Sequence, residues 1–253
     1  MKLGLVQYSP EWENPGKSIE KIEKLLSQSD KNHDLLIFPE MTLTGFTMNS
    51  IKFSEEIDGI GTQLFMNIAA MLDSNIFAGI IEQDTNKFYN TLVHFDNKGL
   101  IKARYRKIHP YSYGQEDQYY SGSKELVITD IDHTKFGLSI CYDLRFPELY
   151  RLYTKKGIDV FVNIASWPVQ RIEHWKTLLK ARAIENQCFM IGVNRVGTDP
   201  NLQYNGCSAV FDPTGNCLVL VENEEKIIDC EIDLNLVKDT RNKLPFLNDI
   251  KLI

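Results

Sequence analysis

Three residue types that together support acyl transfer by a thiol occur at the ends of separate segments. Cys141 directly follows the apolar run 136–140. Glu40 and Lys107 each stand just beyond a run of strand length. Singly, each has an ordinary explanation, because a free cysteine packs as a small hydrophobe and a lone glutamate or lysine is usually a solvated charge. Together they provide the nucleophile, base and cation that thiol-based acyl transfer requires.

The proposed roles follow from the chemistry of a thiol. A free cysteine has a pKa of about 8.5, so only about 3% is thiolate at pH 7. Glu40 could take the thiol proton and later give it to a leaving amine. Lys107 could lower the pKa of Cys141 and, with the backbone N–H of Tyr142, hold the negative oxygen of a tetrahedral intermediate. Of the five histidines only His109 lies near these positions in sequence, which disfavours a cysteine–histidine protease mechanism.

Composition excludes several classes of protein. The chain has 253 residues, 43% of them hydrophobic, which is enough for a core without disulfides. A net charge of −6 and the lack of a basic stripe argue against a nucleic-acid partner. The five cysteines are odd in number and have no metal-ligand spacing, so we expect reduced thiols, a cytoplasmic location and no metal or other cofactor.

No apolar run approaches the length of a membrane span or of a signal-peptide core, so we expect a protein that neither enters a membrane nor is exported. No linker, charge block or repeat marks a boundary. Residues 1–253 are therefore expected to form a single domain.

Hydrophobic periodicity predicts alternating strands and helices. Strands are predicted at 3–7, 35–38, 76–81, 91–95, 100–105, 136–140, 159–164, 189–194, 208–212, 217–221 and 227–232. Helices are predicted at 17–26, 63–72, 148–156 and 171–186. Turns at 96–99 and 213–216 predict two hairpins.

Both halves of the chain show the same order of strand, helix, strand, helix, strand and hairpin. Helices that cover one face of each sheet would produce an α/β fold, a four-layer α-β-β-α sandwich of two similar halves. A single doubly wound sheet is the alternative, because strand order is not visible in a sequence. In either case Cys141 lies on a strand-to-helix turn, a placement that suits a nucleophile.

The motifs resemble those of the nitrilase superfamily of carbon–nitrogen hydrolases. The Glu-Lys-Cys triad of that family is carried in segments similar to FPEM at 38–41, YRKIH at 105–109 and CYDLRFPE at 141–148. The resemblance extends over about 3–232 and includes NIASW at 163–167, ARAIENQ at 181–187, NRVG at 194–197, YNGCS at 204–208 and DPTG at 212–215. It implies the α-β-β-α sandwich, a catalytic triad of Glu40, Lys107 and Cys141, and a second glutamate, matched by Glu116, that assists positioning or proton transfer.

Within the family the chain looks most like the omega-amidase branch. Members of that branch remove the terminal amide of 2-oxoglutaramate or 2-oxosuccinamate, so the resemblance implies attack of Cys141 on an amide carbon, loss of ammonia and hydrolysis of a thioester. Another short-amide hydrolase, such as one acting on deaminated glutathione, is the nearest alternative, followed by a nitrilase. A non-catalytic binding protein would be expected to lack part of the triad, which is complete here. Family members commonly form dimers, and we expect a homodimer on that ground.

Four residues are candidates for substrate binding: Arg145, Trp167, Phe46 and Tyr142. Arg145 suits an anionic substrate, because a guanidinium binds a carboxylate through two hydrogen bonds. Its alternative role is a structural pair with Asp143 or Glu148. The aromatic residues could form the wall of a pocket, although large aromatic side chains more often belong to the core.

Overall fold

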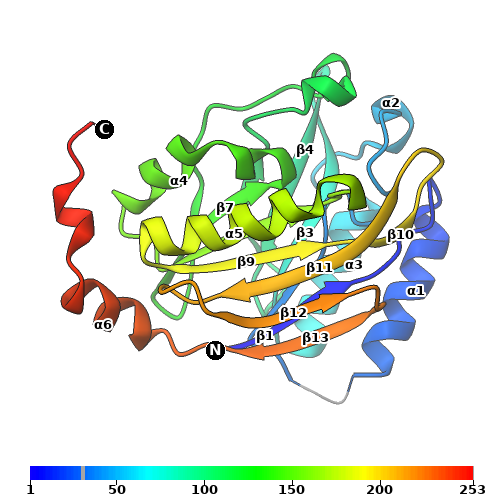
Figure 1. Ribbon diagram of the computed structural model, residues 1–253. Helices are drawn as coiled ribbons and strands as arrows, with labels where there is room; N and C mark the ends of the chain where they lie inside the picture. The colour runs from blue at the N-terminus through cyan, green and yellow to red at the C-terminus, as the bar shows by residue number, and fades with distance from the viewer. Residues whose placement is uncertain (30–31, 253) are drawn as a thin grey trace.

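The structure is a computed structural model that describes residues 1–29 and 32–252 and contains two β-sheets (Figure 1). The strands of the first sheet are β1 (Lys2–Gln7), β2 (Leu35–Ile37), β3 (Asn75–Asp84), β4 (Lys87–Phe95), β5 (Ile101–Arg106) and β13 (Lys226–Glu231). The strands of the second sheet are β6 (Ile128–Ile131), β7 (Thr134–Ile140), β8 (Val160–Ala165), β9 (Phe189–Asn194), β10 (Val196–Thr198), β11 (Gln203–Phe211) and β12 (Cys217–Glu222). Their spatial orders are β13-β1-β2-β3-β4-β5 and β10-β11-β9-β8-β7-β6, with β12 beside β11.

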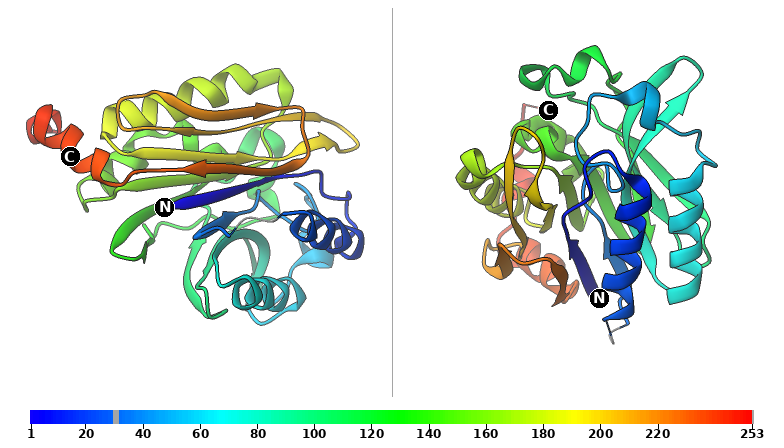
Figure 2. Two further views of the ribbon diagram at one scale, coloured as in Figure 1. Left: turned by 90° about the horizontal axis from the view of Figure 1, so that it is seen from below. Right: turned by 90° about the vertical axis from the view of Figure 1, so that its right-hand side faces the viewer.

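Helices cover the outer faces of both sheets, and Figure 2 shows α1 and α3 on one side with α5 on the other. The α-helices are α1 (Pro15–Ser27), α2 (Ser50–Phe53), α3 (Ile60–Leu72), α4 (Pro147–Thr154), α5 (Ile172–Asn186) and α6 (Asn235–Lys243). Short 3-10 helices are η1 (Ser112–Gly114), η2 (Glu116–Gln118), η3 (Cys141–Arg145), η4 (Val169–Arg171) and η5 (Phe246–Asp249).

Three apolar clusters hold these layers together. One lies between the sheets and joins residues such as Leu5 and Ile37 to Leu138 and Val162. The other two pack α1 and α3 against the first sheet and α4 and α5 against the second. This arrangement confirms the α-β-β-α sandwich and shows that the alternative of one doubly wound sheet is wrong.

Local chemistry explains the hairpin predicted at 96–99. The side-chain oxygen Oδ1 of Asp96 accepts hydrogen bonds from the backbone N–H groups of Lys98 at 3.0 Å and Leu100 at 2.9 Å. Gly99 has a φ of +78°, which a residue without a Cβ adopts readily. The turn joins β4 to the antiparallel β5, as predicted.

Strands β3 and β4 extend beyond the predicted ranges 76–81 and 91–95, because polar pairs continue the sheet where the apolar pattern ends. Glu82 is buried in β3, and its carboxylate bonds the guanidinium of Arg106 at 2.7 Å. A buried charge with a close partner is tolerated in a strand, but a hydrophobicity pattern does not reveal it. The two strands therefore form a hairpin of their own.

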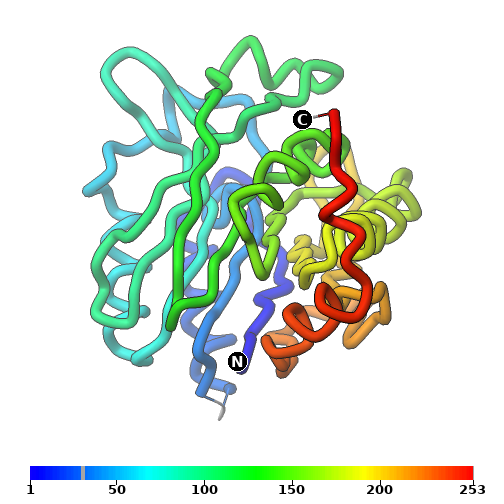
Figure 3. Tube along the Cα trace, turned by 90° about the vertical axis from the view of Figure 1, so that its left-hand side faces the viewer, coloured from blue at the N-terminus to red at the C-terminus, as the bar shows by residue number. Residues whose placement is uncertain are grey.

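The C-terminal strand β13 lies in the first sheet, where it pairs antiparallel with β1. The chain thus returns from the second half to the edge of the first. Helix α6 follows and runs beside the second half (Figure 3), where Arg241 donates hydrogen bonds to the carbonyl oxygens of Ile158 and Gln187. Neither α6 nor α2 was predicted, since α6 is predominantly polar and α2 has only 4 residues.

Strand direction brings the three candidate residues to one edge. β2 and β3 are parallel, β4 is antiparallel to β3, and β5 is antiparallel to β4. β5 therefore runs in the same direction as β2, so Lys107 leaves its strand at the same end as Glu40. Cys141 directly follows β7 in the facing sheet.

Gly79 of β3 gives the segment around Glu40 the space it needs. A Cβ at this position would lie 2.6 Å from the backbone nitrogen of Met41 and 2.8 Å from the backbone oxygen of Pro39. We predict that Gly79→Ala lowers the free energy of unfolding by about 1 to 3 kcal/mol, because backbone must move to admit the methyl group. Urea denaturation followed by circular dichroism measures this change.

Gly16→Ala is the matched control, because the nearest atom to its added Cβ is 3.8 Å away and Gly16 lies in α1. Its free energy of unfolding should be unchanged or higher by up to about 1 kcal/mol. Equal stability of the two variants would contradict the steric account of Gly79.

Candidate active site

Cys141 opens η3 immediately after β7 and has an unusual backbone conformation. Its φ is +47°, in the left-handed region that residues with a side chain occupy at an energetic cost. A sharp turn of this kind aims a side chain out of the end of a strand. Cys141 is a half-buried free thiol, and α4 begins after η3, so the predicted strand-to-helix turn is confirmed.

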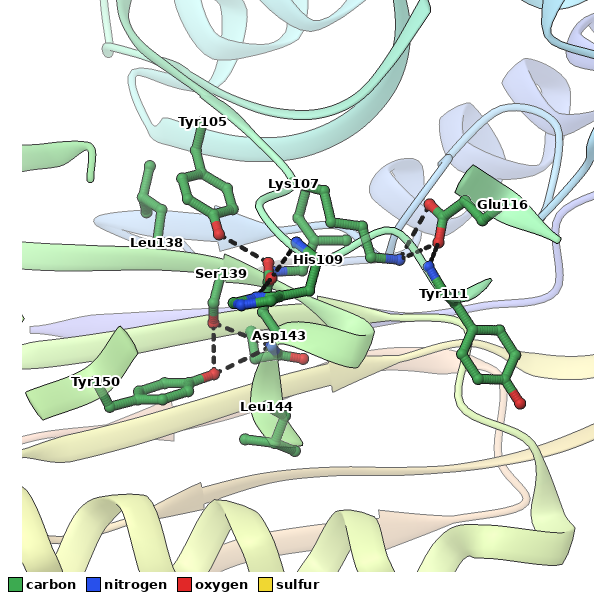
Figure 4. A network of polar contacts seen from close by, with 12 residues as sticks. Tyr105, Lys107, His109, Tyr111, Glu116, Leu138, Ser139, Asp143, Leu144 and Tyr150 are labelled. Carbon is green, nitrogen blue, oxygen red and sulfur yellow. Dashed lines mark hydrogen bonds and ion pairs between the residues drawn. The ribbon is translucent and has the colours of Figure 1, made fainter. Parts of the chain in front are cut away.

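The side chains of Glu40, Lys107 and Glu116 form one buried cluster. The Lys107 ammonium donates to Oε1 of Glu40 at 2.9 Å. It also donates to both carboxylate oxygens of Glu116, at 2.8 and 3.1 Å (Figure 4). The side-chain amide of Asn90 donates to Oε1 of Glu40 at 2.7 Å and to Oε1 of Glu116 at 2.9 Å. The remaining oxygen of Glu40 accepts the backbone N–H of Ser166 at 2.8 Å. Every carboxylate oxygen in the cluster thus has a donor.

The loop that carries Glu116 is shaped by the same carboxylate. Gln115 has a φ of +61°, which turns the chain before η2. Oε2 of Glu116 accepts the backbone N–H of Tyr111 at 2.6 Å (Figure 4). The backbone N–H of Glu116 in turn bonds the carbonyl oxygen of Tyr111 at 3.1 Å. This reciprocal pair holds the 111–116 loop closed over Lys107.

Burial and charge set the protonation of the cluster. Burial by itself would lower the pKa of Lys107, but the carboxylates of Glu116 and Glu40 more than offset it and hold that pKa well above its ordinary value. Burial also raises the pKa of Glu116, although Lys107 acts in the opposite direction. Lys107 is therefore a permanent cation at neutral pH.

The Cys141 thiol is next to this cluster. Burial raises its pKa well above the ordinary value, and the negative charge of Glu40 acts in the same direction. The charge of Lys107 and a hydrogen bond from the Ser166 backbone act against that rise. Cys141 is consequently a neutral thiol in the resting protein, and a base is needed to activate it.

A cleft of about 390 Å³ opens in front of Cys141. All four residues expected to contact substrate line it: Phe46, Tyr142, Arg145 and Trp167. The Arg145 guanidinium lies 4.7 Å from the centre of the Trp167 ring and 3.3 Å from Nδ1 of His174. Phe46 lies against the cluster, with its ring centre 5.4 Å from the Lys107 ammonium.

Among the described residues Arg145 forms no ion pair with Asp143 or Glu148, the alternative role considered for it. The carboxylate of Asp143 accepts the side-chain N–H of His109 at 2.7 Å instead. Glu148 is exposed at the start of α4. Arg145 stacks on aromatic rings instead, so its guanidinium is available to an anion.

Sequence reasoning missed three functional candidates. Asn90 bridges the two glutamates from within β4, and Arg171 lines the cleft as a second guanidinium, 5.7 Å from the centre of the Tyr111 ring. Asp143 was considered only as a partner of Arg145. Arg171 had one available signal, since it is a cation just before a predicted helix that follows the family-like segment 163–167.

Residues 1–29 and 32–252 contain neither a candidate metal site nor a helix that could span a membrane. No group of three or more His, Cys, Asp or Glu side chains there is placed to hold a metal ion. None of the helices there combines the length and apolarity needed to cross a membrane.

Known proteins resemble this chain in sequence and in fold. The family model for carbon–nitrogen hydrolases matches residues 2–242. A 2-oxoglutaramate amidase of Bacillus subtilis (strain 168) is 35% identical over 251 residues, covering 98% of this chain and 97% of that protein. An omega-amidase of Yersinia enterocolitica is 31% identical and covers 98% of this chain and 96% of that protein.

Among solved structures, a carbon–nitrogen hydrolase superfamily protein of Xanthomonas campestris with an arsenic adduct in its active site has a TM-score of 0.94. It is 30% identical and covers 100% of this chain and 98% of its own. The chain belongs to the carbon–nitrogen hydrolase family.

The raised pKa of Cys141 predicts how its alkylation depends on pH. Because only the thiolate reacts, the rate constant with iodoacetamide should rise about tenfold per pH unit from about pH 6.5 to about pH 8.5, without a plateau. Peptide mapping by mass spectrometry follows Cys141, and the exposed Cys217 serves as a reference in the same digest. A plateau below pH 8 would show a stabilised thiolate and contradict the neutral resting thiol.

Proposed function

We propose that the protein hydrolyses the terminal amide of small carboxylated omega-amides, such as 2-oxoglutaramate or 2-oxosuccinamate, and releases ammonia. The observation that carries this proposal is a single cleft in which Cys141 lies with two guanidinium groups, those of Arg145 and Arg171. Among the described residues both contact aromatic rings and neither pairs with a carboxylate. The name of the Bacillus subtilis relative supports this substrate.

The first half of the reaction forms a thioester. Glu40 accepts the proton of the Cys141 thiol, and the sulfur attacks the amide carbon while the carbonyl electron pair moves onto oxygen. The Lys107 ammonium and the backbone N–H of Tyr142 stabilise that oxygen. The carbon–nitrogen bond then breaks, Glu40 passes its proton to the nitrogen, and ammonia leaves.

The second half releases the acid. Glu40 removes a proton from water, and the resulting hydroxide attacks the thioester carbon. The carbon–sulfur bond breaks, and the proton on Glu40 returns to the Cys141 sulfur. The new carboxylic acid loses its remaining proton to solvent, so the product leaves as a dicarboxylate. Glu116 holds Lys107 through both carboxylate oxygens and so keeps the ammonium in place during both steps.

The two guanidinium groups select the acyl side of the substrate. A carboxylate takes two hydrogen bonds from one guanidinium, and a neighbouring 2-oxo group offers a further acceptor to the second. The Arg145 guanidinium lies over the Trp167 ring, a contact that holds it without neutralising its charge. The cleft therefore fits a short chain with an amide at one end and a carboxylate at the other.

A wider outer cleft supports a second candidate, hydrolysis of amides with a larger amine, as in deaminated glutathione. It has a volume of about 1090 Å³, part of which is open solvent, and it shares Phe46, Tyr111 and Leu202 with the inner cleft. Its charged lining residues, among those described, are Glu13 and Asp199. Two carboxylates repel a carboxylated peptide, which favours a primary amide. Ammonia or amine release from a panel of primary and N-substituted amides distinguishes the two candidates.

We propose three further properties: a single domain, a cytoplasmic location and a homodimer. The matched range 2–242 supports treating residues 1–253 as one carbon–nitrogen hydrolase domain. All five cysteines are free, which fits a reducing, cytoplasmic location. The expected homodimer rests on the family resemblance, and light scattering after gel filtration tests it.

The nucleophile is tested by Cys141→Ala. This variant should release no ammonia from 2-oxoglutaramate, because the thioester cannot form, while its free energy of unfolding changes by no more than about 1 kcal/mol. Cys217→Ala, which alters an exposed thiol outside the cleft, should retain full activity. Undiminished turnover by Cys141→Ala would overturn the mechanism.

The carboxylate clamp is tested by Arg145→Gln and Arg171→Gln. Loss of a charge-assisted pair should raise KM for 2-oxoglutaramate by about 10- to 100-fold in each variant. Activity on an uncharged amide of the same length should change little. Arg151→Gln is the matched control, since Arg151 bonds the Glu185 carbonyl oxygen outside the cleft. Equal losses on charged and uncharged amides would contradict the clamp.

A further inference from the structure

A buried carboxylate outside the Glu40–Lys107–Glu116 cluster collects four hydrogen bonds. Oδ1 of Asp143 accepts the backbone N–H of His109 at 3.0 Å and its ring Nδ1–H at 2.7 Å (Figure 4). Oδ2 accepts the hydroxyl of Tyr105 at 2.7 Å and the backbone N–H of Ile140 at 3.0 Å. Asp143 is fully buried, so its charge is balanced by these donors rather than by water.

The four donors come from the two segments that carry reactive groups. Tyr105 and His109 flank Lys107, two residues before and two residues after it. Ile140 directly precedes Cys141, and Asp143 itself lies in the turn that Cys141 opens. These segments leave different sheets, β5 of the first and β7 of the second. A single carboxylate therefore fastens the Lys107 segment to the Cys141 turn across the interface between the sheets.

We propose that Asp143 is a positioning residue that fixes the Lys107 ammonium relative to the Cys141 sulfur. This inference rests on the proposed role of Cys141 as the nucleophile. Asp143 does not line the cleft, and it acts through the two segments it joins. The His109 ring, whose edge bonds Asp143, also stacks on Phe146, with the ring centres 3.7 Å apart and an angle of 7° between the rings.

The geometry requires a carboxylate and not an amide. All four partners donate, so both oxygens must accept. An asparagine in one orientation would direct its NH₂ at the backbone N–H of His109, and in the other at the backbone N–H of Ile140. Either way a buried backbone donor loses its acceptor, which is costly, and the two segments separate.

The first experiment measures the reactivity of Cys141 in Asp143→Asn with iodoacetamide across pH. The charge of Lys107 opposes the rise in the pKa of Cys141, so displacement of Lys107 should shift the alkylation profile to higher pH. At about pH 7.5 the rate constant should fall by about 10- to 100-fold, because the thiolate fraction falls about tenfold for each pH unit by which the pKa of Cys141 rises. The rate at Cys217 in the same digest should not change.

A matched pair of tyrosine variants covers the case in which Asp143→Asn does not fold. Tyr105→Phe removes one donor to Asp143 and should slow Cys141 alkylation by about threefold to tenfold, as one lost hydrogen bond predicts. Tyr150→Phe removes a neighbouring buried hydroxyl that bonds Ser139 and Asn163 instead (Figure 4). Its alkylation rate should stay within about twofold of the unaltered protein.

Two results would overturn the proposal. One is a folded Asp143→Asn protein whose Cys141 profile matches that of the unaltered protein. The other is an equal effect of Tyr105→Phe and Tyr150→Phe, which would indicate general loosening of the core. Alkylation needs no substrate, so the result is independent of amide specificity. If the unaltered protein fails on 2-oxoglutaramate yet the profiles shift as expected, the substrate assignment fails and the positioning role stands.

Discussion

The buried ion cluster of Lys107 with two glutamates is the interaction on which the rest of the site depends. A charge taken out of water costs several kcal/mol unless close partners replace its hydration. Lys107 is 1% exposed, and its ammonium lies 2.9 Å from Glu40 and 2.8 Å from Glu116. Removing Lys107 would leave two buried carboxylates without a cation. The cluster also keeps a cation beside Cys141, where the attack on an amide creates negative charge.

The fold supplies this cluster by bringing strand ends from two sheets to one edge. Alternation of strands and helices is local in sequence, so the layers and the two halves could be predicted. Strand order depends on contacts between distant segments. The position of β13 beside β1 therefore could not be predicted from the sequence. Charged pairs inside strands, such as Glu82 with Arg106, likewise lengthen the sheet beyond the apolar pattern.

The residues of the candidate site were likewise predictable from the sequence only in part. Motifs beside strand ends carry their own local signal, and this made three residues predictable: Glu40, Lys107 and Cys141. Asn90 has no such signal in the sequence around it. Its amide reaches the two glutamates only because β4 pairs with β5 in the folded protein. Asp143 was assigned to Arg145 by nearness in sequence, whereas the fold gives it His109. Arg171 lines the same cleft as Trp167, but its place there depends on the path of the chain between the two residues.

The central claim is that Cys141 carries the acyl group of an omega-amide. Rapid acid quenching during turnover of 2-oxoglutaramate, followed by intact-mass and peptide mass spectrometry, measures this directly. The account predicts a protein heavier by the acyl group of the substrate, with the added mass on the peptide that contains Cys141 and its loss on treatment with hydroxylamine. Ammonia release at full rate with no adduct on that peptide, at quench times shorter than one turnover, would contradict it.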